Sequence, residues 1–334
     1  MTRLRWGVIG IGNLVKGTIA PAMVAEENCE LIATVSRDQG RANEFAARFG
    51  ARYAYTDFDE MLANPEVDAV FIATPNDQHA AQTMAAARAG KHVMCDKPMA
   101  TTVADAVASV EACREAGVKF GINFHNRHLP WVQEARTMVG SGVIGDIDLI
   151  QAEASSGPRH YTNWRADPTM AGLGSLYNVG VHILDFLGWI LDDEAVEVTG
   201  FFDRPPGSGQ VEMLATMLLR FRTGTIAYVN CNEKIHHPKN DIVIYGTKGR
   251  IAGTGLTRSR VDGDLRVLTE AGETITAYPS PGAHRLCVAA FARAVLNDLE
   301  PNPSGLDGLR SMQLCNAIAQ SVIGRTTVEV DYKS

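Results

Sequence analysis

Residues 4–125 alternate two kinds of segment, and this alternation limits the possible folds more than any other feature of the chain. One kind is a short apolar run rich in Val and Ile, typical of strands buried on both faces. Five such runs occupy residues 4–10, 30–36, 68–75, 91–96 and 118–124. Ala-rich stretches with helical character lie between them, and those at residues 79–90 and 103–117 end in glycine. Alternating strands and helices with short links predict a parallel sheet covered on both sides.

The pattern changes after about residue 125. A helix at residues 131–139, a strand at 147–155, an irregular loop with two prolines and an apolar helix at 175–191 precede longer strands. These strands lie at residues 194–202, 213–221, 225–232 and 241–246. Arg222-Thr223-Gly224 reads as a hairpin turn, and two helices at about 285–298 and 305–323 and a last strand close the chain. We therefore expect an α/β chain with a Rossmann-type domain at residues 1–124. An α+β domain with a mostly antiparallel sheet and helices on one face should follow at residues 125–334.

Composition excludes several classes of function. The net charge of −7, without a basic cluster, argues against nucleic acid and anionic membranes as partners. No apolar run reaches the roughly 18 residues of a membrane span, and the N-terminus does not resemble a signal peptide. The six cysteines show no C-x-x-C spacing, which is typical of reduced thiols in a cytosol and gives no zinc framework. We expect a cytoplasmic protein without a metal site.

A glycine pair follows the first strand. Gly10 and Gly12 form the G-x-G of a dinucleotide fingerprint, with Asn13 and Leu14 at the start of the next helix. Gly10 permits a tight turn, and Gly12 lets the backbone approach a pyrophosphate at the helix N-terminus. The third position of the fingerprint is Val15 instead of Gly or Ala. The alternative is an ordinary turn, but the position after the first strand of a βαβ pattern favours dinucleotide binding.

The end of the second strand bears on which dinucleotide is bound. Ser36 and Arg37 stand where NAD-binding proteins usually carry an acid for the ribose, and an arginine there accommodates the 2′-phosphate of NADP. Asp38 is the counter-argument, because a shift of one residue would bring it to the ribose. The sequence therefore favours NADP, with NAD as the second choice.

Two polar features occupy otherwise apolar segments. Lys97 follows a buried strand, at the edge where open α/β sheets bind ligands, although a plain surface lysine would look the same. Asn178, His182 and Asp185 are spaced four and then three residues apart, so they share one stripe of the helix at 175–191. The polar side chains of that stripe either hydrogen-bond to one another inside a core, with Asp185 as the partner of His182, or face a cavity where a reaction takes place.

Together these segments resemble the Gfo/Idh/MocA oxidoreductases over essentially the whole chain. The resemblance is carried by "GVIGIGN", "ATPNDQHAAQTMAAARAGKHVMCDKPMATT", "NWRADPTMAGLGSLYNVGVHILD", "YGTKGRI" and "GLDGLRSMQLCNAIAQSV". It implies NAD(P)-dependent hydride transfer to or from a sugar, keto-sugar, polyol or related cyclic alcohol. It also implies a homodimer or homotetramer formed through the open-faced sheet.

The resemblance also assigns residues. Lys97 matches the lysine of the family's E-K-P motif, and His182 matches the histidine of its D-x-x-x-H motif. The glycine turn, Ser36 and Arg37 are expected near the cofactor. Further residues expected there are Thr74, Pro75, Asn76, His79, Asp96, Lys97 and Arg165. Residues expected near the substrate are Lys97, Arg127, Trp164, Asn178 and His182.

Three departures from the family pattern matter. Asp96 shortens the usual Glu, Leu173 interrupts the usual G-G-G, and Asn178 replaces the Asp of D-x-x-x-H. Because an amide cannot take a proton, acid–base work falls to His182 and Lys97. We expect Lys97 to stabilise the substrate oxygen and His182 to supply or accept its proton. The alternatives are a non-catalytic NADP-binding regulator and an NAD-dependent glycoside hydrolase.

Overall fold

The computed structural model describes residues 3–255, 257, 262–279 and 282–333, and the chain divides into two compact units. Unit 1 comprises Met1–Phe124 and His284–Met312, and unit 2 comprises His125–Ala283 and Gln313–Ser334. The segment from His284 to Met312 is therefore grouped with the N-terminal unit, whereas the sequence placed it in the C-terminal domain.

Unit 1 is built on a six-stranded parallel sheet in the order β3-β2-β1-β4-β5-β6. The strands are β1 (Leu4–Ile9), β2 (Cys29–Val35), β3 (Tyr53–Tyr55), β4 (Ala69–Ile72), β5 (His92–Cys95) and β6 (Phe120–Ile122). Five of them confirm the predicted strands and the Rossmann-type sheet. Only β3 lacks a sequence signal, because three partly buried residues are too few to show a pattern.

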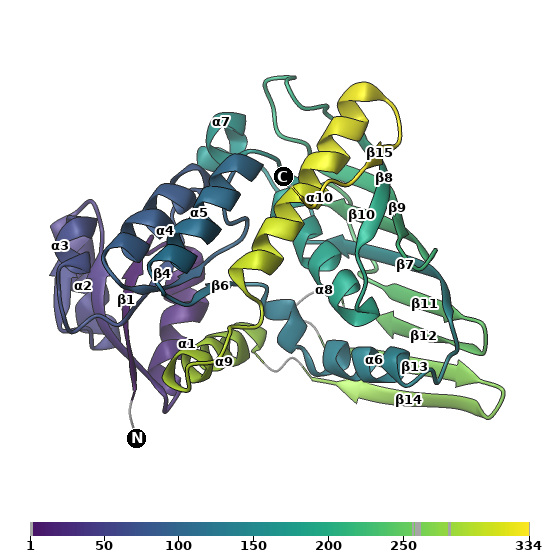
Figure 1. Ribbon diagram of the computed structural model, residues 1–334, viewed down its shortest axis with the longest axis horizontal. Helices are drawn as coiled ribbons and strands as arrows, with labels where there is room; N and C mark the ends of the chain where they lie inside the picture. Colours follow the sequence, from purple (N-terminus) through teal and green to yellow (C-terminus); the bar gives the residue numbers. More distant parts are fainter. Residues whose placement is uncertain (1–2, 256, 258–261, 280–281, 334) are drawn as a thin grey trace. The chain divides into compact units, whose positions relative to one another are not determined.

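Helices cover both faces of this sheet. They are α1 (Ala20–Ala25), α2 (Gln39–Phe49), α3 (Phe58–Leu62), α4 (His79–Arg88) and α5 (Val103–Glu115). Side chains of α1 and α2 pack on the β1 face that carries Trp6 and Val8, and α4 and α5 lie on the opposite side of the sheet (Figure 1).

Helix α9 (Ala283–Leu296) completes the first of these faces. Its Phe291 belongs to the same buried cluster as Trp6, and the two ring centroids lie 5.3 Å apart. A helix that buries an apolar face against β1 is part of the core of unit 1, and this explains why the chain returns there after residue 283.

Unit 2 is built on a nine-stranded sheet in the order β14-β13-β12-β11-β7-β10-β9-β8-β15. The strands are β7 (Ile147–Ser155), β8 (Ala195–Phe202), β9 (Leu214–Phe221), β10 (Ile226–Asn232), β11 (Ile242–Gly246), β12 (Gly249–Thr254), β13 (Gly263–Thr269), β14 (Gly272–Tyr278) and β15 (Val328–Glu329). β7 and β10 pair in parallel and the other neighbours pair antiparallel, which confirms the mostly antiparallel sheet.

The helical segments of unit 2 lie between these strands in the chain. They are η3 (His125–His128), α6 (Pro130–Gly140), η4 (Trp164–Ala166), α7 (Pro168–Ala171), η5 (Leu176–Gly180), α8 (Val181–Leu191) and the part of α10 (Gly305–Gly324) from residue 313 onward. The apolar helix predicted at residues 175–191 is thus η5 and α8, a five-residue π-helical stretch followed by an α-helix.

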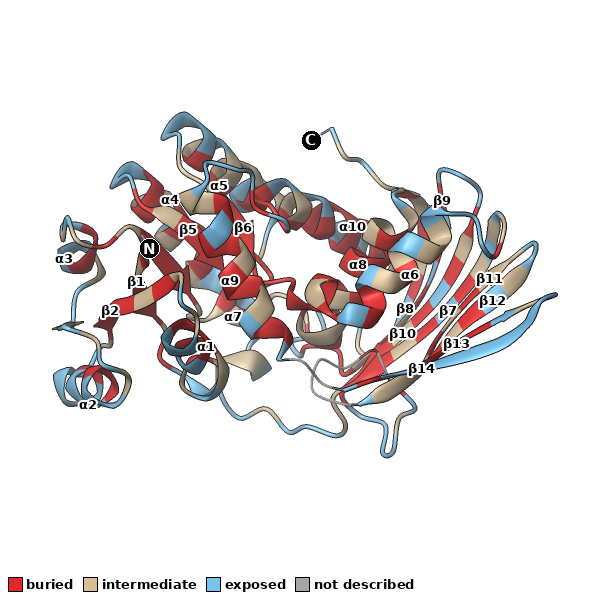
Figure 2. Cartoon of the chain, turned by 90° about the horizontal axis from the view of Figure 1, so that it is seen from below, coloured by how far each residue is buried: buried red, intermediate tan, exposed pale blue. Residues whose placement is uncertain are grey.

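One face of the nine-stranded sheet is open. Leu218 of β9 lies opposite Tyr228 of β10, and their residues are 51% and 40% exposed. Phe201 of β8 extends this surface, and β14 is exposed along nearly its whole length (Figure 2). The face predicted to remain open is therefore present and carries large apolar side chains.

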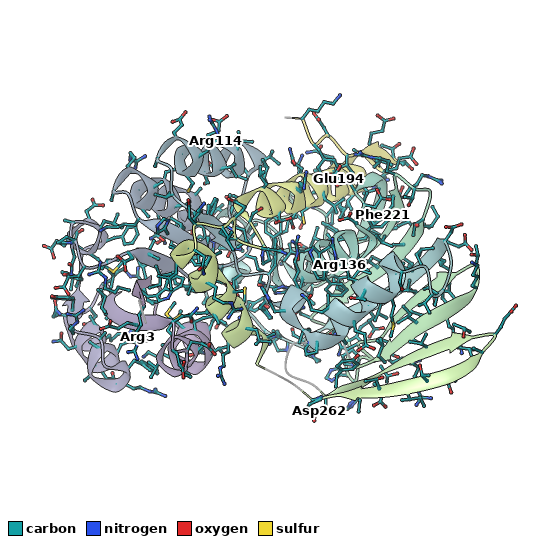
Figure 3. All side chains as sticks on the ribbon, turned by 60° about the horizontal axis from the view of Figure 1, so that its bottom comes forward. Arg3, Arg114, Arg136, Glu194, Phe221 and Asp262 are labelled. Atoms are coloured by element: carbon teal, nitrogen blue, oxygen red, sulfur yellow. The ribbon has the colours of Figure 1, made fainter. Side chains whose placement is uncertain are left out.

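Helix α6 supports α8. Trp131 packs edge-to-face on Phe186 with ring centroids 5.4 Å apart. Arg136 lies on α6 (Figure 3). Its guanidinium is 4.3 Å from the ring centroid of Trp189, and it forms an ion pair of 3.0 Å with Asp192. These contacts fix the helix that carries His182.

Among the described residues, no helix has the length and apolar character needed to cross a membrane.

Candidate functional site

The turn after β1 forms a tight backbone cradle. Gly10 has φ +88°, and a Cβ there would overlap the backbone carbonyl of Ala73, so only glycine fits. The backbone N–H of Gly12 donates to the carbonyl of Gly10 at 2.7 Å, which closes the turn. Asn13 and Leu14 begin the helical segment that follows. A helix N-terminus behind a glycine turn of this shape suits an anionic pyrophosphate.

The helix after this turn departs from regular geometry. Residues Val15–Ile19 form a π-helical turn, and the N–H of Ala20 bonds to the carbonyl of Val15. Val15 is completely buried in the core beneath the helix. Such π-helical turns occur frequently at functional sites.

The residues after β2 have separate roles. The carboxylate of Asp38 accepts a hydrogen bond of 2.7 Å from the backbone N–H of Arg41 and caps helix α2. Arg37 is exposed and Ser36 is half-buried. The acid that stood as the counter-argument to NADP is therefore engaged by its own helix.

His79 links two loops at the carboxyl edge of the sheet in unit 1. Its Nδ1 lies 2.7 Å from the carbonyl oxygen of Pro98, and its Nε2 lies 2.9 Å from the carbonyl oxygen of Thr74. The ring is buried, and Thr74 also donates to Gln82 at 2.7 Å. His79 thus connects the loop containing Thr74, Pro75 and Asn76 to the loop containing Lys97.

Asp96 is half-buried and contacts a buried polar pair, Asn123 and His284, at the same edge. Its Oδ1 accepts from Nδ2 of Asn123 at 2.9 Å, and Asn123 lies 3.3 Å from Nδ1 of His284. His284 stands at the start of α9, nearly 190 residues beyond Lys97 in the chain. Sequence reasoning missed both Asn123 and His284, because nothing near either residue forms a recognisable motif.

A buried carboxylate holds the start of the helical segment that carries Asn178. Glu212 accepts from the backbone N–H groups of Gly174 at 2.7 Å and Leu176 at 2.9 Å. A Cβ on Gly174 would overlap the carbonyl oxygen of Glu212, so this glycine is required by the close approach. Burial raises the pKa of Glu212 to about 7, although the backbone donors favour its charged form.

Asn178 lies in a hydrogen-bonded cluster that the sequence did not reveal. Its Nδ2 is 3.1 Å from Oη of Tyr161 and 3.2 Å from Oε2 of Glu233, and Tyr161 donates to the same Glu233 oxygen at 2.5 Å. Glu233 follows β10 and is 2% exposed. A carboxylate is thus present beside the position where the family pattern has an Asp, but the segment that follows β10 supplies it, not the helix.

His182 is half-buried one turn further along. Its ring meets the ring of His125 edge-on, with centroids 4.6 Å apart. Asp185, the third member of the stripe, forms a buried bidentate ion pair with Arg127 through bonds of 2.8 and 2.7 Å. Arg127 was expected at the substrate, and in the structure its guanidinium is engaged by this carboxylate.

The remaining predicted residues, Trp164 and Arg165, lie in the short helical segment η4. Arg165 stacks on Trp164 with its guanidinium 4.2 Å from the ring centroid, and both residues are half-exposed. Tyr177 of η5 is buried, and burial raises its pKa far above the usual value, as suits a packed aromatic residue. His236 and His237 are exposed loop residues. In the described part of the chain, no group of three potential ligands could hold a metal ion.

The parallel sheet with its glycine turn is that of an oxidoreductase with an NAD-binding Rossmann fold, and the family model of that description matches residues 4–124. A second model, the GFO/IDH/MocA C-terminal domain, matches residues 132–252. The chain belongs to the Gfo/Idh/MocA family of oxidoreductases.

Individual relatives are similar over nearly their whole length. A 1,5-anhydro-D-fructose reductase from Ensifer adhaerens is 29% identical over 330 residues, which is 98% of each chain. The crystal structure of an aldose-aldose oxidoreductase from Caulobacter crescentus complexed with glycerol matches with a TM-score of 0.90 and 28% identity, over 98% of this chain and 99% of that one. A 3-ketoreductase mutant from Actinomadura kijaniata in complex with TDP-benzene and NADP matches with a TM-score of 0.85 and 27% identity, over 96% and 98%.

Proposed function

We propose that this protein transfers a hydride between NADP(H) and a sugar, keto-sugar, polyol or related cyclic alcohol. The observation that carries the proposal is the glycine cradle at Gly10, which lies at the carboxyl end of β1 in a chain of this family. The similar proteins named above act on sugars or contain glycerol or a nucleotide compound, and this supports a polyhydroxylated substrate.

The nucleotide preference rests on the end of β2. Because Asp38 caps α2, Arg37 is the charged side chain left to meet a ribose phosphate. A charge-assisted hydrogen bond contributes about 1.5–3 kcal/mol, so Arg37→Ala should lower kcat/KM for NADPH on the order of 10- to 100-fold and change that for NADH little. Arg48→Ala, at the far end of α2, is the matched control. An equal loss with both nucleotides would contradict the assignment.

The catalytic roles fall to Lys97 and His182. When bound, the nicotinamide supplies or accepts the hydride. Lys97 donates a hydrogen bond to the substrate oxygen as negative charge grows there, and His182 gives that oxygen its proton or takes it back. Lys97→Met and His182→Ala should each lower kcat on the order of 100-fold or more. Wild-type turnover by either variant would refute the role of that residue.

The first experiment is a substrate screen with both nucleotides. 1,5-Anhydro-D-fructose, keto-sugars, aldoses and polyols would be incubated with NADPH and NADP⁺, and absorbance at 340 nm followed. Deuterium transfer from 4-deuterated NADPH to a carbonyl compound separates a reductase from a non-catalytic regulator. Cleavage of a glycoside without net change in nucleotide would support a hydrolase instead.

We also propose that the open sheet face joins copies of this chain. Leu218 and Tyr228 face the same side of neighbouring strands, and a contiguous exposed apolar face of this kind is typical of protein–protein contacts. Light scattering after size-exclusion chromatography should give a dimer or tetramer, and Leu218→Glu/Tyr228→Glu should give a smaller species. A monomeric wild-type protein would refute the proposal.

A further inference from the structure

Glu233 is a buried carboxylate with an unusually complete set of donors. Its Oε1 accepts from Oγ of Ser156 at 2.8 Å and lies 3.4 Å from Nε of Arg159. Its Oε2 accepts from Tyr161 and from Asn178. An ionised carboxylate costs several kcal/mol to bury unless such partners compensate. These donors therefore stabilise a negatively charged Glu233 carboxylate next to the side-chain amide of Asn178.

The three hydrogen bonds among Asn178, Tyr161 and Glu233 fix which way that amide faces. Tyr161 uses its single O–H on Glu233, so its oxygen accepts from Asn178. Both acceptors near the amide are oxygen atoms, one of them negatively charged. A flipped amide would bring the carbonyl Oδ1 against them, which is electrostatically unfavourable. The nitrogen therefore faces Glu233, and Oδ1 faces the other way.

Tyr161 donates a hydrogen bond to Glu233 but does not give up its proton. Burial and the neighbouring charge of Glu233 raise the pKa of its phenol far above the usual value. The phenol therefore stays neutral and serves to bridge Glu233 and Asn178.

We propose that Glu233 is a positioning residue that turns Oδ1 of Asn178 toward the substrate, so that Asn178 accepts a hydrogen bond from a substrate hydroxyl. This inference rests on the proposed function. Asn178 precedes His182 by about one helical turn, so the hydroxyl it accepts from is the one next to the reacting carbon. The substrate class is thereby narrowed to compounds with a free hydroxyl adjacent to the carbonyl or to the carbinol that is oxidised.

A comparison of two substrates tests the proposal. The ratio of kcat/KM for 1,5-anhydro-D-fructose to that for its 3-deoxy analogue, which lacks the adjacent hydroxyl, would be measured in four proteins. Wild type should favour the hydroxylated compound by on the order of tenfold, the value of one hydrogen bond. Asn178→Ala should bring the ratio near one, and Glu233→Gln should give an intermediate ratio, since a neutral amide no longer dictates the orientation. Glu329→Gln, on exposed β15, should keep the wild-type ratio.

A merely structural role for Glu233 would lower kcat/KM for both compounds equally and leave the ratio unchanged in Glu233→Gln, which would overturn the proposal. A second measurement does not depend on turnover. In protein labelled with ¹⁵N-asparagine, the side-chain amide signals of Asn178 can be assigned by their loss in Asn178→Asp. Glu233→Gln should shift these signals and speed their exchange with solvent, and unchanged signals would also overturn the proposal. If wild type turns over neither compound, the amide signals alone decide the role of Glu233, and the substrate screen with both nucleotides decides the proposed function.

Discussion

Glu212 makes the free energy of unfolding depend on pH. Its ordinary pKa is 4.5 and burial raises it to about 7 in the folded protein. The folded state therefore binds a proton more tightly than the unfolded chain does. The resulting stabilisation is complete below pH 4.5 and is lost as pH rises through about 7. At 1.36 kcal/mol per pH unit, a gap of about 2.5 units corresponds to a loss on the order of 3 kcal/mol.

The perturbation is Glu212→Gln, which keeps the shape of the side chain and removes its titration. Urea unfolding would be followed by tryptophan fluorescence at pH values from 5 to 8, because Trp131 packs against α8. The free energy of unfolding of wild type minus that of the variant should fall on the order of 3 kcal/mol across this range. Glu329→Gln should give a flat difference. A difference that stays constant would show that the donors of Gly174 and Leu176 balance burial, and one that rises with pH would show that they outweigh it. Either result would refute the reasoning.

Three further changes test the two units separately. Gly10→Ala should lower the free energy of unfolding by at least about 1–2 kcal/mol and weaken nucleotide binding, because Cβ is excluded and φ is positive; Gly17→Ala, with open space around it, should do neither. Arg127→Ala should cost about 3–5 kcal/mol by leaving Asp185 charged and unpaired, and Arg127→Met/Asp185→Leu should recover most of that loss in urea unfolding. Phe291→Ala should destabilise unit 1 by about 3–5 kcal/mol in calorimetry, and an unchanged transition would contradict the placement of α9.

Most of the fold could be predicted because its signals are local. Apolar runs of six to nine residues predicted most of the strands, and glycines with positive φ, such as Gly90 and Gly117, end the helices where expected. The domain assignment of residues 284–312 could not be predicted. The apolar pattern of α9 shows that it packs on something, but only the contact of Phe291 with Trp6 shows on what.

The sequence proposes site residues only where a motif marks them. Gly10 and Lys97 each stand at the end of a strand with a recognisable neighbourhood, and His182 lies on a stripe of fixed spacing. Glu233 carries no such mark, since it is one acid in a loop and gains its meaning from contacts with residues 55 and 72 positions away. Pairings of that length depend on strand order, which local sequence does not encode.

The two-part composition of unit 1 has a consequence for its synthesis. A ribosome releases residues 1–124 long before Phe291, so the apolar side of β1 that receives α9 remains uncovered while the strands of unit 2 are being made. A fragment ending at residue 124 would carry that exposed surface permanently and should aggregate or recruit chaperones. Fusing α9 to such a fragment through a flexible linker should restore its solubility.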